Sequence, residues 1–166
     1  MKWAGAVLIL SFSLSIGLAA AWEEKRRVRS LDAFCRLLTA MREQISVLRL
    51  PGKEIFARYS DPFLAETGFL AAVSQAEHSV TPMAEALRAP GMKRRLSLSD
   101  GDYAALCTFA EKFGQGDSAQ ECARCDAALF TLHASLERTA ARAPENARIL
   151  RAVSISAGIL LVLLLF

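Results

Sequence analysis

A turn between two helices is predicted at Phe113-Gly114-Gln115-Gly116-Asp117-Ser118-Ala119-Gln120. Gly114 and Gly116 break the preceding helix, because glycine adopts backbone conformations that other residues avoid. Ser118 is the predicted N-cap of the next helix, and Glu121, three residues later, completes a capping box. We therefore expect a long helix to begin at Ser118.

The residues after this turn predict a helix that leaves the soluble part of the protein. Apolar residues recur three, four or seven positions apart, which gives one apolar face for packing against other helices. We expect a bend near Pro144 and then an uncharged run, 155–166, which belongs in lipid because it has no polar face. Residues 149–166 are thus the predicted C-terminal transmembrane helix. The apolar positions are Cys122, Cys125, Leu129, Leu132, Leu136 and Ala143.

Composition places a folded domain between two apolar ends. The chain has 166 residues, 53% of them hydrophobic, with a mean hydropathy of +0.27. Residues 23–151 hold all 17 acidic residues and 19 of the 20 basic residues, a net charge of +2. This balance argues against a nucleic-acid partner, whose binding domains carry a strongly basic face. The length suffices for a hydrophobic core, so we expect one domain over residues 23–148.

The N-terminal residues 1–22 predict a transmembrane anchor. Residues 3–22 would form a helix of about 30 Å, enough to cross a bilayer, and Trp3 and Trp22 stand at its two ends. The alternative is a cleaved signal peptide with its cleavage site at Ala19-Ala20-Ala21. An uncleaved anchor is favoured because the basic cluster follows the apolar run. That cluster comprises Lys25, Arg26, Arg27 and Arg29.

The basic residues also predict topology. Arg148 and Arg151 flank the second apolar run on its central side, as the first cluster flanks the other. By the positive-inside rule both flanks stay in the cytoplasm, so the domain between them is cytoplasmic. The second span is short, about 22 Å for residues 152–166, and snorkelling by the two arginines would lengthen it. Attraction to anionic lipid is the main role expected of these cations, and a partner contact is the second.

The central domain is predicted to be all-α, a bundle of about six helices flanked by the two transmembrane helices. Its first long helix ends at Pro51-Gly52, and a short helix over 53–59 follows. Asp61-Pro62 predicts the start of a helix through about 76, and Thr81-Pro82 the start of one through about 88. Ser99 with Asp102 caps a helix that reaches Phe113. The apolar positions of the first helix are Val28, Leu31, Phe34, Leu38, Met41, Ile45 and Leu48.

Between these last helices, Pro90-Gly91 opens a predicted loop with three consecutive cations, Lys93, Arg94 and Arg95. They form either a solvated loop or a contact for an acidic partner.

The residues that bear reactive side chains do not form a recognised catalytic or metal-binding set. Cys122 and Cys125 have the spacing of a metal or redox pair, but a structural zinc normally needs four ligands. Both also lie on the predicted apolar face, as Cys35 and Cys107 lie beside others, and free cysteine behaves as a small buried hydrophobe. His78 and His133 have no carboxylate and nucleophile at a recognised spacing. We expect no catalytic residue, cofactor, metal or small-molecule substrate.

The order of these features resembles the stage III sporulation protein AB family of endospore-forming Firmicutes. The likeness covers essentially the whole chain: an anchor with a basic cluster, a long helix, Pro51-Gly52-Lys53-Glu54-Ile55-Phe56, Leu98-Ser99-Asp100-Gly101-Asp102 and an apolar end. The turn at 113–120 is its most specific part, with Phe113, Gly114, Asp117 and Gln120 as the family-like residues. Pro144 departs from the family pattern, in which this stretch is a charged helix without proline.

This resemblance implies a function that spacing alone does not. The family belongs to the complex that links mother cell and forespore, and its soluble domain is similar to the cytoplasmic domain of type II secretion F and type IV pilus platform proteins. It would be a non-enzymatic platform in the forespore's outer membrane, facing the mother-cell cytoplasm. Its implied partners are a secretion-type ATPase and other channel subunits, and it is a possible homo-oligomer.

Two alternative functions, from other functional classes, predict different properties of the chain. An extracytoplasmic envelope receptor with a cleaved signal peptide would lose the residues up to about Ala21. A membrane-tethered enzyme using Cys122 and Cys125 would bind a metal or have a thiol of lowered pKa.

Overall fold

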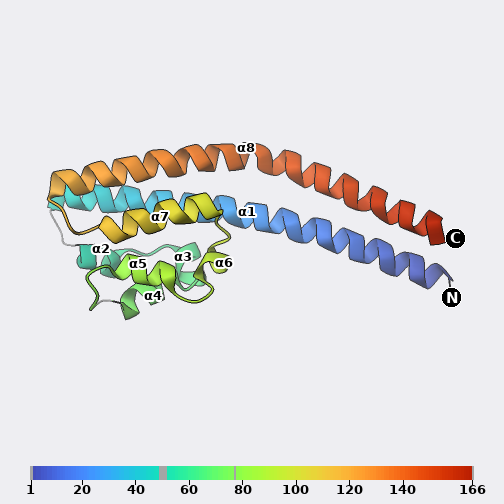
Figure 1. Cartoon of the computed structure of the whole chain (residues 1–166), viewed down its shortest axis with the longest axis horizontal. Helices are drawn as coiled ribbons and strands as arrows, with labels where there is room; N and C mark the ends of the chain where they lie inside the picture. Colours follow the sequence, from blue (N-terminus) through green and yellow to red (C-terminus); the bar gives the residue numbers. More distant parts are fainter. Residues whose placement is uncertain (1, 49–51, 77, 166) are drawn as a thin grey trace. The chain divides into compact units, whose positions relative to one another are not determined.

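A computed structural model of the chain is all-helical (Figure 1), which confirms the predicted fold class. It describes the backbone of residues 2–48, 52–76 and 78–165, and side chains mainly of residues 22–47, 54–76 and 78–142. Within these ranges there is no strand. The helices are α1 (Lys2–Leu48), α2 (Gly52–Arg58), α3 (Pro62–Glu66), α4 (Phe69–Gln75), α5 (Pro82–Arg88), α6 (Met92–Leu96), α7 (Asp100–Lys112) and α8 (Ser118–Leu165).

The chain divides into two compact units. One consists of Met1–Arg26 with Arg138–Phe166, and the other of Arg27–Glu137. The predicted anchors, residues 1–22 and 149–166, fall in the first unit, where most side chains lie outside the described residues. A search of the described residues finds no helix long and apolar enough to cross a bilayer. The two anchors therefore stay predictions.

The core of the second unit forms around α1. Leu31, Phe34, Leu38, Met41 and Ile45 are all buried, as their spacing predicted. Other α1 side chains outside that pattern are buried as well, because helices pack against α1 on more than one side. The rings of Phe34 and Phe69 meet edge to face, 5.2 Å between centroids, which joins α1 to α4. The additional buried residues of α1 are Ser30, Ala33, Cys35 and Leu37.

The prediction of a single helix over residues 62–76 is wrong, because the structure has two helices there, α3 and α4. Gly68 has φ +78°, in the left-handed region that glycine occupies without steric cost. Thr67 ends α3, and its hydroxyl donates to the carbonyl of Leu64 at 3.1 Å. A Cβ at position 68 would also lie 3.4 Å from the guanidinium of Arg95.

The predicted loop after Pro90-Gly91 is also wrong, since residues 92–96 form α6. Met92 and Leu96, one turn apart, are both buried and anchor this short helix to the core. Its three cations therefore project from a helix. With the division of α3 from α4, the described residues contain eight helices in place of about six.

The long last helix begins as expected, but its cap differs. The Asp117 carboxylate accepts the N–H of Gln120 at 2.8 Å, so Asp117, not Ser118, is the N-cap. Glu121 accepts the N–H of Gly116 at 2.9 Å, the residue before the cap, so the capping box predicted between Ser118 and Glu121 is wrong. Downstream, α8 stays helical through Pro144 to Leu165.

Candidate functional site

The family-like turn at 113–120 is the joint between α7 and α8. Phe113 is buried, with its ring 5.4 Å from that of Phe109, and Gly114 takes φ +86°. Arg124 bridges the two helices, donating to the Glu121 carboxylate at 2.5 Å and to the last-turn carbonyl of Lys112 at 2.7 Å. The residues that carry the family likeness therefore hold backbone geometry at this joint.

A buried carboxylate joins three helices within the second unit. Asp102 on α7 is 7% exposed and accepts from the Arg27 guanidinium of α1 at 2.9 Å. It also accepts from the hydroxyls of Ser99 at 2.5 Å and of Ser135, on α8, at 2.6 Å. Sequence reasoning assigned Arg27 to the membrane-proximal basic cluster and Asp102 only to a capping pair, so it missed this connection between them.

Asp102 remains ionised in this setting. Burial raises the pKa of the carboxyl, but hydrogen bonds from Ser135, Ser99 and Arg27 together outweigh burial, and the net pKa is lowered. Asp61 behaves in the same way. Burial raises its pKa, but the N–H groups at the start of α3 and the guanidinium of Arg36 lower it overall.

The other predicted basic positions are in part exposed and in part outside the described side chains. Lys25, Arg26 and Arg29 are exposed. Lys25 and Arg26 belong to the first unit and Arg29 to the second. The side chains of Arg148 and Arg151 lie outside those that the structure describes.

The three consecutive basic residues of α6, Lys93, Arg94 and Arg95, differ in their contacts. The ammonium of Lys93 is 2.5 Å from the carboxylate of Asp100 and 5.8 Å from the ring centroid of Tyr103. Arg94 and Arg95 are exposed. Lys93 is exposed as well, but these two arginines differ from it in taking part in none of the ion pairs found among the described residues.

The cysteine pair lies on the packed face of α8, as its spacing predicted. Cys125 is fully buried, and burial raises the pKa of its thiol to about 12. Burial likewise raises the pKa of Cys35 to about 11. A raised pKa is the opposite of what a reactive thiol needs. Among the described residues, no group of three or more His, Cys, Asp or Glu side chains is placed to hold a metal ion.

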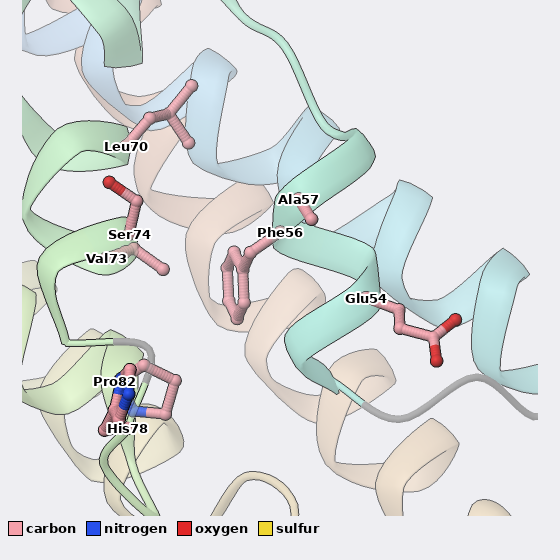
Figure 2. Close-up of a pocket in the computed structure, with 8 residues that line it drawn as sticks. All are labelled: Glu54, Phe56, Ala57, Leu70, Val73, Ser74, His78 and Pro82. Atoms are coloured by element: carbon pink, nitrogen blue, oxygen red, sulfur yellow. The ribbon is translucent and has the colours of Figure 1, made fainter.

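An open groove of about 540 Å³ lies between α2, α4 and the start of α5 (Figure 2). Its lining is mainly apolar. Sequence reasoning missed it, because it depends on how three short helices pack and no motif marks it. The lining residues are Glu54, Phe56, Ala57, Leu70, Val73, Ser74, His78 and Pro82.

Comparison with known protein families finds a match over nearly the whole chain. The model of a family described as stage III sporulation protein AB (spore_III_AB) matches residues 2–166. No curated protein and no solved structure matches the chain.

Proposed function

The chain belongs to the stage III sporulation protein AB family, and from this we propose that it is a membrane platform component of the channel complex between mother cell and forespore. In this proposal residues 1–22 and 149–166 span the forespore's outer membrane, and residues 23–148 face the mother-cell cytoplasm without catalysing a reaction. The observation that carries the proposal is the family match across residues 2–166.

The placement of the chain ends supports two anchors in one membrane. Residues 1–26 and 138–166 form one compact unit, although they are far apart in sequence. These segments contain seven basic and three acidic residues, and most of the cations flank the apolar runs on their central side. Such a distribution favours a cytoplasmic location for the residues between the runs.

The partner in this proposal is a secretion-type ATPase that docks on the helical unit, with other channel subunits beside the membrane helices. The structure of the unit supports a docking role, because long-range ties hold its helices in place. Asp102 connects α1, α7 and α8, and Asp61 connects α1 to α3 through Arg36. A surface held by such ties changes little when a partner binds, which lowers the entropic cost of association.

Topology provides the direct test. Trypsin is added to intact protoplasts that carry the full-length protein with an epitope tag beside α6, where Arg94 and Arg95 are exposed. The proposal predicts cleavage there only after the membranes are lysed. Cleavage in intact protoplasts would place the domain outside and replace the platform with an extracytoplasmic envelope receptor.

A further inference from the structure

The groove of Figure 2 has an apolar floor with polar groups at its edges. The ring of Phe56 projects from α2 into the space opposite Leu70 and Val73 of α4. Pro82 and His78 close one end, and the carboxylate of Glu54 lies beyond Phe56 at the other. An apolar channel of this kind, bordered by a few polar groups, suits an amphipathic helix laid along it.

A second observation concerns the chain segment between the two residues that close one end of the groove. Val80 is 83% exposed, and in sequence it lies between His78 and Pro82, which both line the groove. An exposed apolar side chain that continues an apolar groove indicates a protein contact more strongly than an isolated one does.

Charge identifies the kind of occupant. Glu54 is the one carboxylate among the eight lining residues, and none of the eight is a Lys or Arg. Glu54 is exposed and takes part in none of the ion pairs found among the described residues. An unpaired carboxylate at the edge of the groove attracts a cationic partner and repels an anionic one.

We propose that this groove binds a basic amphipathic helix of the secretion-type ATPase, whose apolar side chains cover Phe56, Leu70 and Val73 while a Lys or Arg pairs with Glu54. The assignment rests on the proposed function, because the ATPase is the partner named there. It adds the surface and the chemistry of the contact. Arg94 and Arg95 on α6 take no part in this contact.

Binding of the purified ATPase to the full-length protein in detergent micelles tests the assignment, with affinity measured by biolayer interferometry. Glu54→Lys reverses the edge charge, and Ser74→Arg places bulk and positive charge inside the groove. We expect each to weaken binding about tenfold or more.

Matched controls come from α1. Glu43 and Ser46 are exposed there, and Ser46 donates to the carbonyl three residues earlier at 3.0 Å, as Ser74 does at 2.9 Å. Glu43→Lys and Ser46→Arg should change the affinity less than about twofold, because surface substitutions away from a contact have small effects.

Photo-crosslinking in sporulating cells gives a second readout that does not depend on affinity. A photoreactive residue replaces either Val80, 83% exposed beside the groove, or Phe130, 80% exposed on α8. We expect an adduct with the ATPase from position 80 and none from position 130.

The outcomes separate the two proposals. If the wild-type protein binds and both groove variants bind equally well, the groove assignment is wrong and the platform function stands. If the wild-type protein does not bind the ATPase, both are wrong. A crosslink from position 80 to a second copy of the chain would also overturn the assignment, in favour of self-association.

Discussion

Asp102 illustrates what one residue contributes to this molecule. Its carboxylate accepts from Arg27, Ser99 and Ser135, so it links α1, α7 and α8 at a buried position. Breaking a buried pair costs more than an exposed one, because the remaining charge is left without its partner.

Asp102→Ala should therefore lower the free energy of unfolding by about 3 kcal/mol. Asp126→Ala is the matched control. Asp126 on α8 pairs with Arg42 on α1, again between residues far apart in sequence. Because both side chains are about half exposed, the loss should stay below about 1 kcal/mol. Denaturant unfolding of the full-length protein in detergent, followed by circular dichroism, measures both. Equal losses would show that burial of Asp102 contributes nothing.

At this scale the sequence predicts packing better than pairing. The positions of Leu31, Phe34 and Cys125 on apolar faces follow from helical spacing, and all three are buried. The pairing of Arg27 with Asp102 joins residues 75 positions apart, which no local pattern encodes. Arg27 also lies next to an apolar run. Membrane topology already explains a basic residue there, so nothing in the sequence suggested an ion pair.

At the scale of single helices, the capping residues predicted where most helices begin. The prediction failed where two adjacent residues both suited the N-cap. Ser99 caps α7 as expected, and Asp61 caps α3. At α8 the adjacent Asp117 and Ser118 both suit an N-cap, and the structure selects Asp117. The break at Gly68 was missed because a single glycine does not by itself predict the end of a helix. The short helix α6 was missed because two apolar residues are too few to show a helical spacing.

The two candidate caps of α8 provide a prediction. Asp117→Ala should lower the free energy of unfolding by about 1 kcal/mol, because the N–H of Gln120 loses its acceptor. Ser118→Ala, within the first turn, should change it by less than about 0.5 kcal/mol. Thermal or denaturant unfolding of the two variants decides between them. The reverse order would restore Ser118 as the cap.

Across the whole molecule, two buried carboxylates make stability depend on pH. Asp61 and Asp102 both have a folded-state pKa below the ordinary value of about 3.9. Their contribution is therefore complete above about pH 4 and is lost as the pH falls through the lower folded-state pKa values. Protonation would release α1 from both α3 and α7.

The protein should thus lose stability steeply below about pH 4, by up to about 1.4 kcal/mol per pH unit for each group. Asp61→Asn combined with Asp102→Asn should start from lower stability at pH 7 and show a shallower decline between pH 4 and pH 2. Denaturant unfolding over a pH series measures the slopes. Parallel curves for the two proteins would mean that other carboxylates cause the acid sensitivity.

The fold class was predictable because helical spacing, caps and turns agree along most of the chain. The groove was not, because Phe56, Val73 and Pro82 come from three short helices whose relative packing no local pattern specifies. The prediction of a basic loop at residues 93–95 was wrong for a related reason. The helix α6 forms there because Met92 and Leu96 are buried in a core to which other helices contribute.

The contact of α1 with α8 has a consequence during synthesis on the ribosome. Arg42 pairs with Asp126, 84 residues later, so the first helix acquires this neighbour only after about three quarters of the chain has been translated. At about 5–20 residues per second, the interval is roughly 4–17 seconds. For that time the apolar side of the nascent α1 lacks its contacts with α8, and contacts between residues so far apart in sequence form slowly. A chaperone or protease that acts on nascent chains would therefore bind this protein at α1.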